Sequence, residues 1–501
     1  MQPMPILAWM YDLAREQSPS HDALTVMMQR SLAAGYNAVG LYLEHRFAYP
    51  SVPWPPPSGS LTPAGVTRLQ EHFLPAGLRI VPFLNTLGHL EGFIRAQGGQ
   101  RLSEGRSTGS AQICPTRSEC VAFAHGLVND AIDCFRDEWI HLGGDETRQL
   151  GQCPACAARV ASVGKAGLYG EHYAALCKLV LDRGRRPCLW GDMLLEHPEA
   201  LPHIPRQTLI FDWQYFNRPR DSTRRFRQAG FDVVCCPSVQ TYNSGWCYLD
   251  ATQSNIDEHA EDAAALGALG VLVTSWEFSY FTAYDTALPL IYAAGRRLSR
   301  GESWEAALRA EGGATYARLA AILGREIPAA AEFLKPGTWR QLRDRFVIRQ
   351  NPFYLWQDWR AEACGPAGDR VLALCDRAAL GLADDDPWQL PITLHRVAVG
   401  WVRLAESAAQ RYADGQPAAA ASVLEHGREL LESLRPPLRR AALSGGSCAD
   451  AARLDRLAEK IATVCVRLRA LSGVVWLPAF ETLIHDAYVA GDEAAWRTAK
   501  D

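Results

Sequence analysis

Residues 137–151 read DEWIHLGGDETRQLG, and this stretch indicates how the chain folds. The apolar residues in WIHL (139–142) are typical of a short buried strand. The Gly-Gly pair that follows lets the backbone leave the strand in conformations closed to other residues, with no side chain to block a ligand. Two adjacent carboxylates, Asp145 and Glu146, stand directly after the pair. We therefore expect two acids at the carboxyl end of a buried strand.

The alternation of a short apolar run with a longer helical run extends over the first 300 residues. The predicted strands are 5–9, 37–43, 78–84, 139–142, 187–190, 208–213, 232–236 and 270–276, and the helical patterns between them include 23–35, 119–135 and 171–184. Eight β-then-α units in roughly 250–300 residues predict an α/β fold, a (β/α)8 TIM barrel. A doubly wound open sheet is the alternative, but no glycine-rich phosphate loop follows the first strand.

The pattern changes after about residue 300. Amphipathic helical segments with apolar residues three and four positions apart occupy 392–413, 421–434 and 449–471. We expect a catalytic barrel in residues 1–300 and a C-terminal α-helical domain in residues 301–501, which could also form the surface of a homodimer.

The composition of the 501 residues narrows the class of partner. Hydrophobic residues make up 48% and charged residues 21%, and the net charge is −4. This balance is typical of a globular protein and argues against a nucleic-acid partner. We find neither a membrane-spanning run nor a signal peptide at the N-terminus, so we expect a cytoplasmic protein. The 14 cysteines are then interpreted as reduced thiols.

Acidic and aromatic side chains recur at the ends of the predicted strands. In a (β/α)8 barrel the active-site residues come from the carboxyl ends of several strands, which meet at one mouth. A mouth rich in acids and aromatic rings favours a sugar-binding site. The residues at these ends are Tyr11, Asp12, Glu44, His89, Glu91, Asp145, Glu146, Trp190, Asp192, Asp212, Trp213, Tyr242, Trp276 and Glu277.

HLGGDE (141–146) resembles the H-x-G-G-D-E signature of glycoside hydrolase family 20, the β-N-acetylhexosaminidases. Further stretches are similar in order and in their place in the barrel, namely PFLNTLGHLE (82–91), LWGDM (189–193), FDW (211–213) and TSWE (274–277). The likeness covers roughly residues 5–300. In its organisation the chain resembles the hexosaminidase D branch of the family.

The resemblance implies a retaining mechanism in which the substrate supplies the nucleophile. The oxygen of the 2-acetamido group attacks C1, and an oxazolinium ion forms. Glu146 is expected to protonate the leaving oxygen and later to deprotonate water. Asp145 is expected to orient the acetamido N–H and to stabilise the developing positive charge. Its negative charge should also keep the proton on Glu146 at neutral pH.

The resemblance also implies roles for the residues around the acids. Trp190, Trp213 and Trp276 are expected to enclose the acetamido methyl group and to stack on the sugar ring. Tyr242, with Tyr248 as the alternative, is expected to hold the acetamido oxygen. Glu277, Asp192 and Glu44 are expected to bind sugar hydroxyls, and His89 to support the two acids. The partner is a carbohydrate with a terminal β-linked N-acetylhexosamine, and neither a metal ion nor a cofactor is expected.

The chain departs from the family after the first strand. Many members carry an arginine there that binds O3 and O4 of the sugar. Here the region reads AWMYDLAREQ (8–17), and Arg15 lies far along it. The choice between GlcNAc and GalNAc therefore stays open, although the hexosaminidase D branch favours GalNAc.

Other interpretations remain. A metal-dependent hydrolase would use His141, Asp145 and Glu146 as ligands, but only His89 offers a further histidine ligand at a strand end. A sugar-binding barrel without catalysis would gain nothing from the acid pair. A hexosaminidase for sulfated sugars would need a basic contact near O6.

Two further features are interpreted as structural. Cys153 and Cys156, a C-x-x-C pair, are interpreted as structural or incidental, and the aromatic run 351–359 as packing between barrel and bundle.

Overall fold

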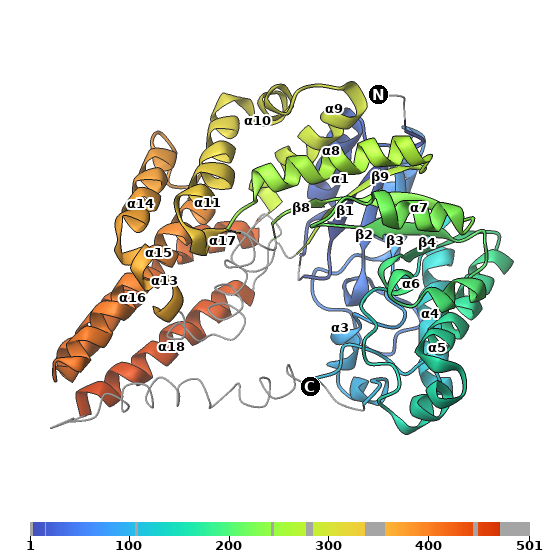
Figure 1. The fold of residues 1–501 in the computed structure, drawn as a ribbon, viewed down its shortest axis with the longest axis horizontal. Coiled ribbons are helices and arrows are strands. Elements are labelled where there is room, and N and C mark those ends of the chain that lie inside the picture. The colour runs from blue at the N-terminus through green and yellow to red at the C-terminus, as the bar shows by residue number, and fades with distance from the viewer. Residues whose placement is uncertain are drawn as a thin grey trace. The chain divides into compact units, whose positions relative to one another are not determined.

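The computed structural model describes residues 4–15, 17–105, 109–241, 245–276, 284–335, 356–443 and 449–470. The chain forms two compact units (Figure 1). The first unit comprises Met1–Val239, Ala251–Trp276 and Leu290–Glu311, and the second comprises Gln240–Asp250, Glu277–Pro289 and Gly312–Asp501. The two units are described separately below.

The first unit is built around a closed barrel of eight parallel strands. Neighbours along the chain pair in order, and the barrel closes where β1 pairs with β9, with Ile6 opposite Gly270 and Trp9 opposite Val273. The strands are β1 (Ile6–Asp12), β2 (Ala38–Tyr42), β3 (Arg79–Phe83), β4 (Trp139–His141), β5 (Arg186–Trp190), β6 (Leu209–Trp213), β7 (Asp232–Cys236) and β9 (Gly270–Ser275). The predicted (β/α)8 barrel is therefore confirmed. A short additional strand, β8 (Ser238–Val239), pairs with β9 and was not expected.

Alternate residues of the strands fill the barrel. On β1 these are Ile6, Ala8 and Met10, all buried, as the two-residue period of a strand requires. The other strands contribute interior residues in the same way, namely Tyr42, Val81, Phe83, Trp139, Cys188, Trp190, Leu209, Phe211, Val234, Cys236 and Leu272. Tyr42, Phe83 and Trp190 are the last residues of β2, β3 and β5 and so lie nearest the mouth. The barrel interior is thus a packed core whose upper surface is aromatic.

Helices lie between the strands, and local signals fix several of their ends. The hydroxyl of Ser20 caps α1 by accepting from Ala23 N, and that of Thr62 caps α2 by accepting from Gly65 N. The helices of this unit include α1 (His21–Ala33), α2 (Pro63–Phe73), α3 (Glu91–Ile94), α4 (Ser118–Cys134), α5 (Pro154–Asp182), α6 (Asp192–Glu196), α7 (Arg220–Gln228) and α9 (Leu288–Arg300). Two further helices begin in one unit and end in the other, α8 (Leu249–Leu266) and α10 (Trp304–Ala321).

The second unit is helical. Long helices pack side by side, α15 against α16 and α16 against α18, with apolar faces that bury residues such as Trp401 and Leu424. Its helices include α11 (Ile327–Ala330), α13 (Trp356–Cys364), α14 (Pro366–Ala379), α15 (Gln389–Ala413), α16 (Pro417–Glu432), α17 (Arg435–Leu443) and α18 (Ala449–Ala470). The helical C-terminal region is confirmed. The run 351–359 lies only partly within the described residues, and none of its side chains is described.

Within the described part of the chain, no helix combines the length and the apolar character that crossing a membrane requires.

Candidate active site

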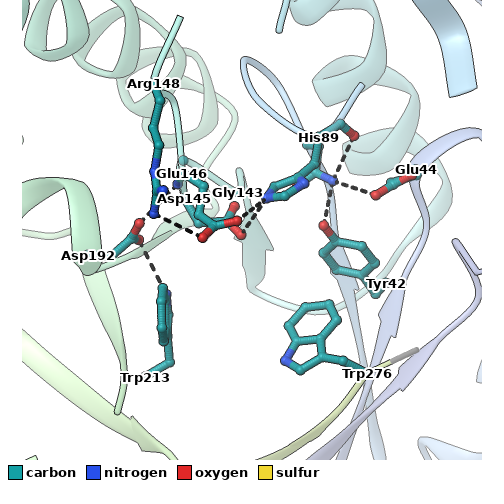
Figure 2. Close-up of polar contacts among 12 residues, drawn as sticks. Tyr42, Glu44, His89, Gly143, Asp145, Glu146, Arg148, Asp192, Trp213 and Trp276 are labelled. Atoms are coloured by element: carbon teal, nitrogen blue, oxygen red, sulfur yellow. Dashed lines mark hydrogen bonds and ion pairs between the residues drawn. The ribbon is translucent and has the colours of Figure 1, made fainter. Parts of the chain in front are cut away.

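The candidate site lies at the carboxyl ends of the barrel strands, within the first unit (Figure 2). Seven strands of the barrel contribute residues to it, as expected for this fold. In chain order these are Asp12 at the end of β1 and Arg15 after it, Tyr42 at the end of β2 and Glu44 after it, His89 after β3, Asp145 and Glu146 after β4, Asp192 after β5, Trp213 at the end of β6, and Trp276 after β9.

Backbone conformation sets three of these residues apart. Among the described residues other than glycine, positive φ angles occur at Glu44 (37°), His89 (52°) and Glu146 (48°). This left-handed region is costly for residues with a Cβ, and such strain persists only where the surroundings enforce it. All three strained residues lie at the mouth of the barrel, so the backbone independently marks this end of the molecule as functional.

The turn after β4 delivers the acid pair. Gly143 has φ 78° and packs so closely that an added Cβ would lie 2.7 Å from the Leu84 carbonyl oxygen. Its N–H donates to His141 Nδ1 over 3.1 Å. The carbonyl of Gly144 accepts from the Tyr169 hydroxyl over 3.0 Å. The turn is therefore fixed on both sides before the chain reaches Asp145.

His141 supports this turn from the core. It is fully buried and stacks on Phe83, with ring centroids 4.4 Å apart. Burial holds its pKa well below the ordinary value, so the ring is neutral. Because Nδ1 accepts from Gly143, and the ring lies between Phe83 and Trp190, His141 does not act together with Asp145 and Glu146 as a ligand set. This geometry argues against the metal-dependent alternative.

The two acids differ in their exposure. The side chain of Asp145 is 13% exposed and that of Glu146 is 43% exposed. The residue that lies open to solvent can exchange protons with a leaving group and with water, whereas the buried one is shielded. Arg148 Nη2 donates to Glu146 Oε1 over 3.2 Å from the solvent side.

His89 joins the two acids (Figure 2). Its Nε2 lies 3.3 Å from Asp145 Oδ2 and 3.5 Å from Glu146 Oε2, while its Nδ1 lies 3.9 Å from Glu91 Oε1. Burial alone would lower the pKa of His89, but the three carboxylates outweigh burial and raise it well above the ordinary value. His89 therefore carries a proton at neutral pH and places a positive charge between the two acids.

Asp192 holds the main chain of the acid pair. Its Oδ2 accepts from Glu146 N over 2.9 Å, and its Oδ1 accepts from Trp213 Nε1 over 3.3 Å. Burial and then the charge of Asp145 raise the pKa of Asp192 to about 7. Both oxygens are thus used in positioning the site.

Arg15 and Glu44 form a second polar group at the mouth. Arg15 Nη1 lies 3.5 Å from Asp12 Oδ1 and 3.6 Å from Glu44 Oε1. The guanidinium carbon lies 5.4 Å from the ring centroid of Tyr42 and 5.3 Å from that of Trp276. Burial would raise the pKa of Glu44, but hydrogen bonding with His45 and the charge of Arg15 lower it, so Glu44 is ionised.

The sequence did not identify Arg15 as a site residue, because the expected first strand was shorter than β1. The strand was expected to end at residue 9, six residues before Arg15, but it continues to Asp12. Met10 and Tyr11 are buried and paired with β2, which extends the strand. Arg15 therefore follows the strand end by three residues and reaches the mouth.

Aromatic rings form one wall of the site. Trp276 meets Tyr42 edge to face, with centroids 4.9 Å apart, and its Nε1 donates to the Tyr215 hydroxyl over 2.8 Å. The ring of Tyr215 stacks on Trp213 at 4.9 Å. Trp190 lies beneath this wall, buried in the barrel core and 6.2 Å from Trp276.

Tyr42, Tyr215 and Asn85 were not expected in the site. Asn85 Nδ2 donates to the Tyr42 hydroxyl over 2.7 Å and to the His89 carbonyl oxygen over 3.2 Å, so it joins two strand ends. Asn85 lies two residues after β3, within the stretch PFLNTLGHLE (82–91), and this stretch is the sequence signal that could have identified it.

Some predicted residues lie elsewhere. Asp212 points away from the mouth and accepts the hydroxyl groups of Ser222 and Thr223 on α7, over 2.7 and 2.6 Å. Tyr242 and Glu277 lie outside the described residues. Tyr248 belongs to the second unit.

The chain is similar to known proteins over this part of its length. It is 23% identical over 215 residues to a β-hexosaminidase from Akkermansia muciniphila, and the match spans 40% of this chain and 40% of that relative. A β-N-acetylhexosaminidase structure from Bacteroides fragilis superposes with a TM-score of 0.49 and 16% identity, covering 59% of this chain and 66% of the other. A β-N-acetylhexosaminidase structure from Streptomyces coelicolor superposes with a TM-score of 0.47 and 15% identity, covering 61% of this chain and 68% of the other.

Residues 52–290 match the model of the glycosyl hydrolase family 20 catalytic domain. The matched segment contains His89, the acid pair, Asp192, Trp213 and Trp276. This segment, slightly less than half of the chain, is therefore similar to the catalytic domain of glycosyl hydrolase family 20.

Proposed function

We propose that the chain is an exo-β-N-acetylhexosaminidase that releases terminal β-linked GalNAc or GlcNAc by a retaining, substrate-assisted mechanism. The observation that carries the proposal is the pairing of a shielded Asp145 with an open Glu146, both in contact with His89 at the mouth of the barrel. The family supports hydrolysis of a glycosidic bond. The position of the acids supports the division of labour between them.

In the proposed reaction the acetamido oxygen of the substrate attacks C1 while the glycosidic bond breaks. Glu146 gives a proton to the leaving oxygen, and it then takes one from the water that opens the oxazolinium ion. Asp145 accepts the acetamido N–H and faces the positive charge that develops there. Because Asp145 is shielded from water, its charge acts through a medium of low polarity, where it stabilises the ion most.

His89 is proposed to hold both acids in place as a charged hydrogen-bond donor. It lies 3.5 Å from Glu146 Oε2, and the carboxylates around it keep its pKa above the ordinary value of histidine. Asp192 keeps Glu146 in its left-handed conformation by accepting its backbone N–H.

The walls of the proposed sugar site come from Trp213, Trp276 and Tyr42. Arg15 is proposed to donate to sugar hydroxyls, since two carboxylates hold its planar guanidinium over aromatic rings and so fix its direction. The preference for GalNAc, which the resemblance to the hexosaminidase D branch implies, is part of the proposal.

The test compares nitrophenyl β-GlcNAc, β-GalNAc and β-glucoside at equal concentration. Only the two acetamido sugars are expected to turn over, with GalNAc faster, because the glucoside lacks the nucleophile. A thiazoline analogue of the bicyclic intermediate should inhibit strongly, as ligands that resemble a transition state do. Comparable hydrolysis of the glucoside would overturn the mechanism.

A further inference from the structure

A second cluster of reactive side chains lies apart from the acid pair, in the connections that follow β3 and β4. Glu104, Cys114, Cys153 and Cys156 each direct one sulfur or carboxylate oxygen into a common space, and these four atoms all lie within 4.8 Å of one another. It is the one such cluster found among the described residues. Cys156 of the C-x-x-C pair thus contacts Cys114, 42 residues earlier in the chain, and Glu104, 52 residues earlier.

The sulfur atoms are spaced as metal ligands are. Cys114 Sγ lies 3.5 Å from Cys153 Sγ and 3.4 Å from Cys156 Sγ, and Glu104 Oε2 lies 3.2 Å from Cys156 Sγ. A tetrahedral zinc ion with Zn–S bonds of about 2.3 Å has S–S edges of about 3.8 Å. The distances are well beyond the ~2.05 Å of a disulfide bond, and the cysteines are free. Small side-chain shifts would thus admit a metal ion.

The backbone builds this space. Cys153 caps α5, where its Sγ accepts from Cys156 N over 3.4 Å, and Pro154 takes the first helical position. Glu104 Oε1 accepts from Cys153 N over 3.1 Å. The antiparallel bridge between Ser103 and Ile113 brings together the two segments that carry Glu104 and Cys114. All four side chains are therefore directed by the main chain.

Burial and charge also point to a cation. Glu104, Cys114 and Cys156 are fully buried, and Cys153 is partly so. An isolated carboxylate is costly in such buried surroundings, and a cation bound beside Glu104 would offset that cost. Arg117, which donates to the carbonyl oxygens of Leu102 and Ser103, lies beside the cluster.

We propose that Glu104, Cys114, Cys153 and Cys156 bind one Zn²⁺ in a closed, tetrahedral structural site. Thiolates select soft or borderline metals, and three sulfurs with one carboxylate oxygen complete the four ligands that structural zinc prefers. The sequence expectation of a metal-free protein is replaced by this proposal.

The zinc ion would join the two connections that carry the catalytic residues. Ile113, next to Cys114, donates its N–H to the Leu87 carbonyl oxygen, two residues before His89. Gln149, which follows the acid pair, donates its N–H to Gln112 Oε1 over 3.0 Å and accepts from the Ser110 hydroxyl over 2.6 Å. The metal thus fixes the loop of His89 against the loop of Asp145 and Glu146.

The first measurement is the metal content of the full chain, purified in reductant without chelator and then given Zn²⁺. Elemental analysis should find about one zinc ion per chain. Iodoacetamide should modify Cys114, Cys153 and Cys156 only after a chelator has removed the metal. Co²⁺ in place of zinc should give the visible bands and the thiolate charge-transfer band of a tetrahedral sulfur site.

The second measurement uses variants. Cys156→Ser should lower bound zinc from about one ion per chain to nearly none, whereas Cys134→Ser, at a half-buried cysteine outside the cluster, should leave it unchanged. If Cys156→Ser does not fold, the alkylation and cobalt experiments on the native chain decide. Absence of zinc from the reduced native protein, iron in its place, a disulfide within the cluster, or full zinc in Cys156→Ser would each overturn the proposal.

Discussion

Asp192 shows how much of the site depends on one carboxylate that need not touch the substrate. It accepts the backbone N–H of Glu146 and the indole N–H of Trp213. Asp192→Ala removes both acceptors and releases Glu146 from a strained φ of 48°. A misplaced catalytic group of this kind costs up to about 10²-fold in rate.

The matched variant is Asp192→Asn, whose amide oxygen still accepts from Glu146. We expect kcat on a nitrophenyl N-acetylhexosaminide to fall at least about 10-fold further in the alanine variant than in the asparagine variant. Equal rates for the two variants would mean that the contact to Glu146 has no positioning role.

Single residues also show where sequence reasoning fails. The acids, His89 and the tryptophans stand in short motifs next to predictable strands, and the structure brings them together. Arg15 was missed because the end of β1 was placed three residues too early. Asp212 was expected with Trp213 at the mouth, but neighbouring residues of a strand face opposite sides, so only one of them can reach it.

At the scale of elements, the connection from β4 to α5 carries the greatest constraint. Gly143→Ala places a methyl group 2.7 Å from the Leu84 carbonyl oxygen at φ 78°. Strain from the backbone and the clash together should cost about 1–3 kcal/mol of unfolding free energy and should also displace the acid pair. The measurement is urea unfolding together with kcat.

The control for this variant is Gly184→Ala, which has φ 69° but no atom within 4 Å of the added methyl group. Gly184→Ala should lose unfolding free energy only through the strained backbone, without a steric clash. Because Gly184 lies away from the mouth, kcat should be unchanged. A Gly143→Ala enzyme with native kcat would contradict the view that this turn positions the acids.

The strands were predictable because their buried runs are short and separated by helical patterns. The start of α5 was not. The helix was expected from residue 171 but begins at Pro154. Glycines interrupt the apolar period there, and Gly164 has φ 74° inside the helix. The sequence signals for the earlier start are Cys153 as the cap and Pro154 in the first turn.

At the scale of the whole molecule, the charged cluster at the mouth links stability to pH. His89 has a pKa raised above its ordinary value by Asp145, Glu146 and Glu91. Its contribution to stability is complete below about pH 6.5, the pKa of an unfolded histidine, and is lost as pH rises through the raised folded value. His89→Asn should therefore lower the unfolding free energy more at pH 6 than at pH 9.

His125→Asn is the control with the opposite sign. Burial lowers the pKa of His125, so its charged form opposes folding and its removal should help more at pH 6 than at pH 9. Denaturant unfolding at the two pH values measures both variants. If the loss of unfolding free energy in His89→Asn is as large at pH 9 as at pH 6, His89 is not charged in the folded protein.

The closure of the barrel is also a property of the whole chain. The alternation of elements predicts eight strands, but it does not give the register in which β1 meets β9. Nor does any local pattern join Cys153 and Cys156 to Cys114 and Glu104. Both are long-range pairings, which are set by tertiary packing rather than by neighbouring residues.

The most direct test of the account is kcat for Asp145→Asn on a nitrophenyl N-acetylhexosaminide. Asparagine keeps the size of the side chain and an acceptor for His89, but it removes the charge that we propose faces the acetamido group. If Asp145 stabilises the oxazolinium ion, kcat should fall about 10²–10³-fold. A folded Asp145→Asn enzyme with near-native kcat would contradict substrate-assisted catalysis by this acid pair.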